Sequence, residues 1–209
     1  PSINGKLFSF FQVVGAGKTL GMFALPFALN ASVKMHHEAA PRVDRMLIIT
    51  KDQALRSQIA NELRTEPVQY GLVQRAPEVL EIENGSQLID ANRDHDIAVM
   101  CPNMLWPERD AIDADAVGNV DGTTIQWHPH MDNILNAYPL ICFDEMHYAY
   151  YNIALLVKAA RQNLVFGFTA SPIEAAGSLL EDMVRVSVYG YGAANHYDNS
   201  MKYLSTGAR

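Results

Sequence analysis

A short glycine-rich segment near the start of the chain has the composition of a phosphate-binding loop. It stands between an apolar run and a helical stretch, and it reads Gly15-Ala16-Gly17-Lys18-Thr19. Glycines allow backbone N–H groups to point inward, and a helix N-terminus adds the positive end of its dipole. Lys18 would reach the β- and γ-phosphates of ATP, and the Thr19 hydroxyl would bind Mg²⁺. The full P-loop pattern has glycine where this chain has Gln12. The alternative interpretation is a glycine turn that binds no ligand.

Two adjacent carboxylates follow a later apolar run. The run extends from Leu140 to Phe143, and Asp144 and Glu145 come directly after it. Ligands of open parallel sheets gather at the carboxyl ends of strands, where Lys18 is expected as well. Past the strand end both acids can turn toward one site. Asp144 would then hold Mg²⁺, and Glu145 would orient and deprotonate an attacking water. Taken alone, an Asp-Glu strand end is more typical of a solvated turn.

A third apolar run, from Leu164 to Phe168, is followed by the hydroxyl residues Thr169 and Ser171. Hydroxyls at this place can hydrogen-bond a carboxylate of a phosphate site and transmit its state to other parts of the protein. The alternative interpretation is an ordinary cap between a strand and a helix.

Apolar runs alternate with helical stretches along the chain, and this order predicts the scaffold that positions these residues. Buried strands are expected at 7–14, 46–50, 97–100, 140–143, 164–168 and 183–188, with further strands at 68–74 and 79–82. Helices are expected from Thr19 to about Val33 with a kink at Pro26, from a Thr50/Gln53 capping box to Glu66-Pro67, and between 149 and 160. The alternation predicts an α/β domain with a mostly parallel sheet covered by helices on both faces.

The stretch from about 102 to 138 is the least regular part of the chain. It is acidic and rich in turn residues, and Asp121-Gly122 precedes a β-prone segment. We interpret it as a loop insertion with a hairpin rather than as a second domain, so that one domain occupies residues 1–209.

Composition excludes several classes of protein. The chain has 209 residues, 16 basic against 23 acidic side chains, and a formal net charge of -7, so it is not a broadly basic nucleic-acid binder. Its two cysteines exclude a disulfide scaffold and a multi-cysteine zinc site. The longest apolar run is too short to span a membrane, and we expect an intracellular protein without a membrane partner. Local basic residues, Lys51, Arg56 and Arg64, are candidates for phosphate contacts.

The order of these segments resembles the first RecA-like motor domain of superfamily-two helicases and translocases. Residues 15–19 look like motif I of that family, whose first position is often Ala. Asp144-Glu145-Met146-His147 resembles the DEAH type of motif II, with Met where Ala is usual, and Thr169-Ala170-Ser171 resembles motif III. Ile48-Ile49-Thr50-Lys51 resembles motif Ia, and Pro102 lies where another contact to the nucleic-acid backbone is expected.

The resemblance implies a RecA-like P-loop NTPase that hydrolyses ATP with Mg²⁺ and moves on DNA or RNA. Glu145 would be the catalytic base, with Lys18 and Asp144 beside it. His147, Thr169 and Ser171 would couple hydrolysis to a second domain, and Thr50, Lys51 and Pro102 would contact nucleic acid. The family's second RecA-like domain, which supplies arginine fingers, is not expected in this chain. We therefore expect a fragment whose two ends fall at domain edges and which is a weak ATPase by itself.

Two other functions remain open from the sequence. A different P-loop NTPase, such as a small-molecule kinase, would transfer phosphate without responding to nucleic acid. A binding module with a vestigial site would hold nucleotide tightly without turnover. The pattern does not distinguish DNA from RNA, or unwinding from translocation.

Overall fold

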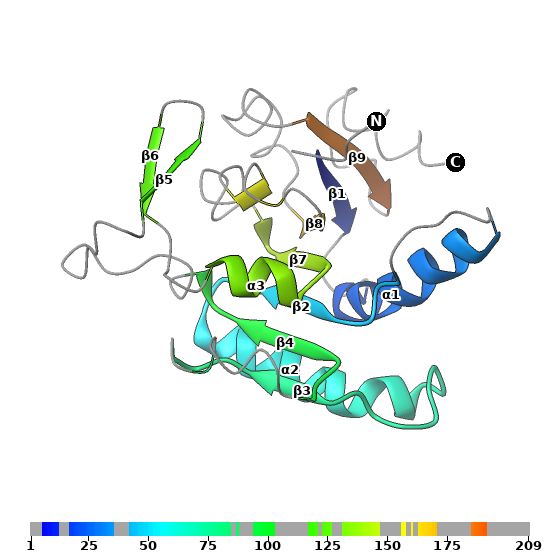
Figure 1. Ribbon diagram of the computed structural model, residues 1–209. Coiled ribbons are helices and arrows are strands. Elements are labelled where there is room, and N and C mark those ends of the chain that lie inside the picture. The colour runs from blue at the N-terminus through cyan, green and yellow to red at the C-terminus, as the bar shows by residue number, and fades with distance from the viewer. Residues whose placement is uncertain are drawn as a thin grey trace.

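In the computed structural model of the chain, seven strands form one parallel sheet (Figure 1). The structure describes residues 6–12, 17–35, 42–84, 87, 94–102, 117–120, 123–126, 131–146, 156–157, 160, 163–170 and 185–191. The strands of this sheet are β1 (Lys6–Gln12), β2 (Met46–Ile49), β3 (Val79–Glu81), β4 (Ile97–Met100), β7 (Leu140–Asp144), β8 (Leu164–Thr169) and β9 (Arg185–Tyr191). Their order across the sheet is β3-β4-β2-β7-β8-β1-β9. Every neighbouring pair is parallel, which confirms the predicted α/β architecture.

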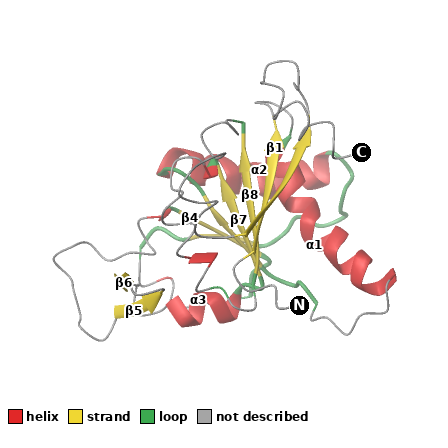
Figure 2. Ribbon diagram, turned by 90° about the horizontal axis from the view of Figure 1, so that it is seen from above, coloured by secondary structure: helices red, strands yellow, loops and turns green. Residues whose placement is uncertain are grey.

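Two long helices cover one face of this sheet. They are α1 (Lys18–Met35) and α2 (Gln53–Gln69), which lie together in Figure 2, apart from the short helix α3 (Met131–Ala137). Phe23 of α1 and Leu63 of α2 belong to one buried cluster with alternate strand residues such as Ile48. Leu47 and Ile49 point to the opposite face, and they are 0% and 1% exposed. Because both faces are covered, the central strands are continuous apolar runs, as is typical of parallel sheets.

The start of α2 differs from the prediction. Thr50 and Gln53 were expected to form a capping box, but the N-cap is Asp52, whose carboxylate accepts the Leu55 N–H at 3.0 Å. The Thr50 side chain is buried and its hydroxyl donates to the carbonyl oxygen of Asp52 at 3.1 Å. Thr50 therefore closes the turn between β2 and α2, and the cap falls two residues later.

The end of α2 also differs. Pro67 was expected to stop the helix, but it lies inside α2, which continues to Gln69 with Tyr70 as its C-cap. Gly71 follows the cap with a left-handed φ of 67°. The Leu72 and Gly71 N–H groups donate to the carbonyls of Pro67 and Val68 at 2.8 and 3.0 Å, the pattern of a glycine-terminated helix. The strand predicted at 68–74 is therefore wrong.

Part of the region predicted as an insertion has regular structure. The expected hairpin is present as β5 (Val117–Val120) and β6 (Thr123–Gln126), which pair antiparallel and stand apart from the main sheet in Figure 1. The region is not wholly loop, because its last residues form α3. Most of the helix predicted between 149 and 160 lies outside the described residues. Within this range, Leu156 and Val157 are described, and they are helical and buried.

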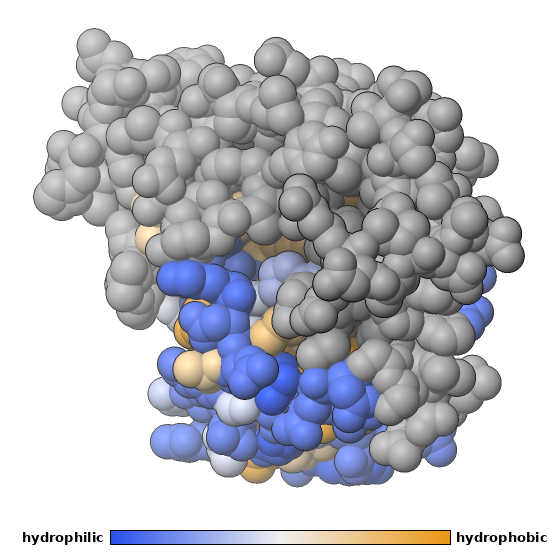
Figure 3. All heavy atoms as spheres, turned by 90° about the vertical axis from the view of Figure 1, so that its left-hand side faces the viewer, coloured by the Kyte–Doolittle hydropathy of each residue, from blue (hydrophilic) through white to orange (hydrophobic). Residues whose placement is uncertain are grey.

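Figure 3 shows one face of the molecule, on which the described residues are mostly hydrophilic with scattered apolar ones. Within the part of the chain that the structure describes, the exposed large apolar side chains are those of Phe27, Met35, Val68, Tyr70 and Leu72. Among the described residues, no helix combines the length and the apolar character needed to cross a bilayer.

Candidate active site

The glycine-rich segment leads directly into α1 after β1. Gly17 has a φ of 76°, a left-handed conformation that favours glycine. Its carbonyl oxygen accepts the Gly21 N–H at 2.9 Å, so the first turn of α1 begins at this glycine. Lys18 and Thr19 are the first two residues of α1, whose N-terminus carries the positive end of the helix dipole. Gly15 and Ala16 lie outside the described residues.

Lys18 meets both predicted acids across the carboxyl edge of the sheet. Its Nζ lies 3.3 Å from Asp144 Oδ1 and donates a hydrogen bond to Glu145 Oε1. β1 and β7 each flank β8, so Lys18, which follows β1, lies close to the end of β7 although the two are distant in sequence. The three side chains are largely buried, with 15%, 6% and 18% of the lysine, aspartate and glutamate exposed.

The backbone at the end of β7 turns sharply. Asp144 is the last residue of the strand, and Glu145 has a φ of 52°. A non-glycine residue in the left-handed region is uncommon and costs roughly 1–2 kcal/mol. The turn lets two successive side chains face one lysine, whereas successive residues of a continuing strand would point to opposite faces. Strain of this kind is concentrated at functional sites.

The electrostatics of Asp144 are those of a buried acid beside a cation. Burial raises the pKa of Asp144 above its usual range, and the neighbouring Glu145 charge raises it further. The Lys18 charge and hydrogen bonding from Lys18 and from the Glu145 backbone oppose this rise in pKa. The Asp144 carboxylate therefore depends on cationic compensation to stay ionised.

The residues at this edge fit a hard divalent cation. Asp144 Oδ1 is buried and its described contact is the ion pair with Lys18 at 3.3 Å, and a carboxylate oxygen keeps a lone pair for a metal beside one such contact. Mg²⁺ needs only one or two carboxylates beside the phosphates of its nucleotide. Within the described residues, no group of three or more His, Cys, Asp or Glu side chains is placed so that it could hold a metal ion.

Thr19, the other predicted Mg²⁺ ligand, has a partner that the sequence did not indicate. Its hydroxyl donates to Glu62 Oε2 of α2 at 2.7 Å. The second oxygen of Glu62 accepts a hydrogen bond from Gln58 Nε2, also at 2.7 Å. The only sequence signal was the spacing of Gln58 and Glu62, four residues apart on one helix face, which does not reveal a contact with α1.

Close packing fixes the residue that follows the acids. Met146 is 1% exposed, and its thioether lies against Gly167 of β8. A Cβ atom at Gly167 would lie 2.3 Å from Met146 Sδ and 3.3 Å from Met146 Cβ. A glycine inside a strand often marks such a close approach, so the sequence did contain this signal. Residue 167 must therefore remain small while Met146 occupies this position.

The remaining predicted coupling residues are only partly described. Thr169 ends β8, is 0% exposed, and pairs in register with Phe11 of β1. It therefore lies in the strand between the one that leads into the phosphate loop and the one that ends in the acids. His147 and Ser171 lie outside the described residues.

The predicted nucleic-acid contacts differ in exposure. Thr50 is 1% exposed and its hydroxyl is bound to the backbone, so its side chain does not face solvent. Lys51 is exposed and Pro102 is half-buried. β2 and β4 are neighbours in the sheet, so these two residues follow the carboxyl ends of adjacent strands.

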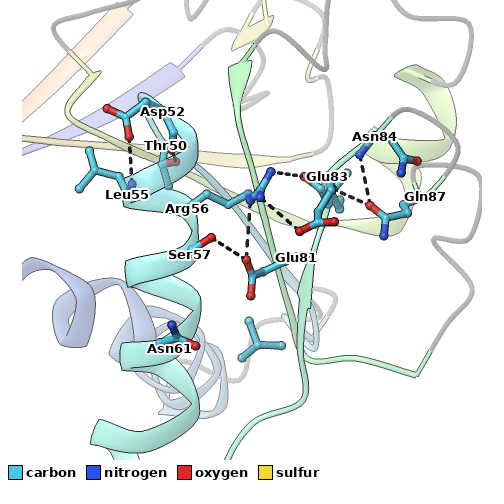
Figure 4. A network of polar contacts seen from close by, with 12 residues as sticks. Thr50, Asp52, Leu55, Arg56, Ser57, Asn61, Glu81, Glu83, Asn84 and Gln87 are labelled. Carbon is cyan, nitrogen blue, oxygen red and sulfur yellow. Dashed lines mark hydrogen bonds and ion pairs between the residues drawn. The ribbon is translucent and has the colours of Figure 1, made fainter.

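Arg56 and Arg64, the candidates for phosphate contacts, form ion pairs with acidic residues of the chain, and Figure 4 shows those of Arg56. Arg56 is buried, donates to the Ile82 carbonyl at 3.3 Å, and pairs with Glu83 at 3.4 Å. Arg64 donates to Glu81 Oε1 at 2.8 Å. Burial by itself raises the pKa of Glu81, but hydrogen bonds from Arg64 and Ser57 and the two arginine charges outweigh it and hold that pKa below its usual value. These arginines attach α2 to β3 and the residues after it.

The parallel sheet, with the loop lysine at the start of α1 and the two acids after β7 meeting at one edge, is the arrangement of an α/β RecA-like domain. Comparison with protein families agrees: the family described as type III restriction enzyme, res subunit, matches residues 6–174. Because this match covers most of the chain, the chain belongs to that family. No curated protein sequence matches the chain at a significant level.

Solved structures that are similar to this chain include two of the UvsW helicase from bacteriophage T4. One has a TM-score of 0.50 at 16% identity and covers 87% of this chain and 30% of that chain. The other has a TM-score of 0.47 at 15% identity, with 87% and 53% covered. The helicase domain of Hef from Pyrococcus furiosus has a TM-score of 0.46 at 19% identity, with 91% and 36% covered. The present chain thus spans about half or less of each of these proteins.

Proposed function

We propose that this domain binds and hydrolyses Mg·ATP and that hydrolysis drives movement on nucleic acid. The observation that carries the proposal is the contact of Lys18 with Asp144 and Glu145 at the carboxyl edge of the sheet. Membership of a family whose matched region contains both segments supports it. Asp144-Glu145-Met146-His147 would be a DEAH-like motif II.

In this proposal the phosphates bind residues 15–19 and Lys18. Backbone N–H groups at the start of α1 would hold phosphate oxygens, and the Lys18 ammonium would neutralise charge on the β- and γ-phosphates. Glu145 would accept a proton from the attacking water while the bond from the γ-phosphorus to the β–γ bridging oxygen breaks. Bound Mg²⁺ would supply positive charge to the phosphate oxygens, and Asp144 and Thr19 are the residues that would hold it.

The charges at the site favour ATP with a bound cation over free ATP. Lys18 lies beside two carboxylates, those of Asp144 and Glu145. When Lys18 turns to the phosphates, Asp144 and Glu145 lose their shared counter-charge in a largely buried place, which is unfavourable. A divalent cation that arrives with the nucleotide restores compensation. We therefore expect ATP to bind more tightly with Mg²⁺ than in a chelating buffer.

The proposed nucleic-acid track passes over the strand ends at Lys51 and Pro102. Phosphate contacts in this region fix position without reading sequence, and an exposed lysine is suited to them. A second RecA-like domain would supply the arginine finger and the rest of the track, so the present chain by itself should hydrolyse ATP slowly. The family's name refers to a restriction enzyme, and DNA is therefore the first nucleic acid to test.

The test is an ATPase assay with and without single-stranded DNA or RNA, on the chain alone and on a chain extended past Arg209. Lys18→Ala should abolish nucleotide binding. Glu145→Gln should retain binding and stop turnover, because it removes the base while preserving size. Parent-level hydrolysis by Glu145→Gln contradicts the base assignment. An extended chain that neither nucleic acid stimulates contradicts the motor function, and phosphate transfer to a small molecule identifies a kinase instead.

A further inference from the structure

The hydrogen bond between Thr19 and Glu62 joins the first turn of α1 to the middle of α2. Thr19 Oγ1 lies 2.7 Å from Glu62 Oε2, a short distance that is usual for a hydroxyl donating to a carboxylate. An ionised carboxylate has no proton to give. The hydroxyl is therefore the donor, and its proton points at α2.

Glu62 is itself held in place. Its other oxygen accepts from Gln58 Nε2 at 2.7 Å, and the side chain is only partly exposed. The neighbouring residues Ile59 and Leu63 are 2% and 0% exposed and belong to the core cluster that contains Met22 of α1. Packing of α2 against α1 thus fixes the carboxylate relative to Thr19.

The direction of the hydroxyl proton determines what the Thr19 oxygen can do. A hydroxyl has one proton and two lone pairs. When a carboxylate on α2 accepts the proton, both lone pairs remain available to a cation. Without that acceptor, the hydroxyl can rotate, so that its proton turns toward the cation site and its lone pairs turn away from it. Partners that orient a metal ligand in this way typically affect metal affinity by about 10- to 100-fold.

We propose that Glu62 is a positioning residue for Mg·ATP, which acts by accepting the proton of the Thr19 hydroxyl and thereby presenting its oxygen to the cation. This inference rests on the proposed function. In this role Glu62 would contact Thr19 and not the nucleotide or the metal. The role assigns a function in the nucleotide site to α2, the helix that follows Lys51 at the proposed nucleic-acid track.

The test measures binding rather than turnover. A fluorescent N-methylanthraniloyl-ATP is titrated into the 209-residue chain in Mg²⁺ and in EDTA, and the ratio of the two Kd values gives the gain in affinity due to magnesium. Glu62→Ala should reduce this gain by about 10-fold and leave the Kd in EDTA unchanged. Glu62→Gln, which retains an acceptor oxygen and the side-chain size, should reduce it less.

Two further variants separate positioning from a general structural effect. Glu66→Ala, one helical turn along α2, removes a carboxylate and leaves the Thr19 contact intact. The gain in affinity due to magnesium should therefore be the same in Glu66→Ala as in the parent. Thr19→Val removes the hydroxyl but keeps the shape. In the Thr19→Val background, Glu62→Ala should cause no additional loss, because the residue through which Glu62 acts is gone.

The possible results distinguish this inference from the proposed function. A parent chain without any magnesium-dependent gain overturns both. A parent with a clear gain that Glu62→Ala leaves unchanged overturns only the role of Glu62. A larger gain in Glu62→Ala also overturns it, since the carboxylate would then withhold Thr19 from the cation. An additional loss in the Thr19→Val background means that Glu62 does not act through this hydroxyl.

Discussion

Replacing Gly167 by alanine would place a methyl group in the contact between β8 and the residue that follows the two acids. The new Cβ atom would lie 2.3 Å from Met146 Sδ, 3.2 Å from its Cε and 3.3 Å from its Cβ. The thioether can rotate away, but the Met146 Cβ is fixed by the backbone. Met146 is also 1% exposed, so the displaced side chain must enter a packed interior.

Overpacking of this kind typically costs 1–3 kcal/mol, and the double clash favours the middle of that range, about 2 kcal/mol. For a chain of this length each kcal/mol shifts the Tm by roughly 2–4 °C. We therefore expect Gly167→Ala to lower the Tm by about 6 °C. Because Met146 directly follows Glu145, the same variant should also slow ATP hydrolysis more than it weakens nucleotide binding.

The assay is urea unfolding of the parent, Gly167→Ala, Met146→Ala and the double variant. Met146→Ala should cost about 2–5 kcal/mol as a cavity, and the double variant should be more stable than the sum of the singles by about 1–2 kcal/mol. Gly71→Ala is the matched control. A Cβ atom at position 71 would meet no atom within 4 Å, so Gly71→Ala is destabilised only by the left-handed φ of 67°. The loss of stability in Gly71→Ala should therefore add to that in Met146→Ala.

Two outcomes would refute the reasoning. Gly167→Ala could unfold at the parent's urea concentration, which would mean that the thioether relaxes at no cost. The double variant could be as unstable as the sum of the singles, which would mean that Met146 and residue 167 do not share the contact.

Two further predictions concern ionisable groups outside the proposed site. The pKa of Glu81 is lowered from 4.5, so its stabilising effect should be complete above about that pH and be lost as the pH falls through the lower folded-state value. Glu81→Gln should weaken this acid sensitivity in urea titrations at pH 7 and pH 4, and an unaltered pH dependence would contradict the assignment. Burial raises the pKa of Cys101 and of Cys142, and both thiols are free. Neither should react quickly with a disulfide reagent until urea unfolds the chain, and rapid labelling of the native chain would show that one of them is accessible.

Much of the sheet was predictable because its strands are buried on both faces. Such strands are uninterrupted apolar runs, and 46–49, 97–100 and 140–143 could be located from this property alone. Local rules were less reliable at the ends of α2. Asp52 and Gly71 determine those ends through cap geometry, whereas the sequence had suggested Thr50 and Pro67.

Only some of the long-range contacts of the site could be predicted from the sequence. The contact of Lys18 with Asp144 and Glu145 was predictable, because the carboxyl ends of parallel strands lie at one edge of the sheet. The partner of Thr19 could not, because it depends on how α1 and α2 pack. Arg56 and Arg64 were interpreted as surface cations for the same reason: only the structure places Glu81 and Glu83 beside them.

The position of β1 in the sheet has a consequence for how the protein is made. β1 precedes the other described strands along the chain, yet its neighbours in the sheet are β8 and β9, so that Leu7 pairs with Val165 and Lys6 with Arg185. Pairings so distant in sequence form slowly, and in a growing chain they must wait for the later strands to be synthesised. Until β8 has been synthesised, β1 therefore lacks both of its partners in the sheet. Lys18, which follows β1, then lacks the support that brings it to Asp144 and Glu145, so this contact forms only after most of the described sheet has been made.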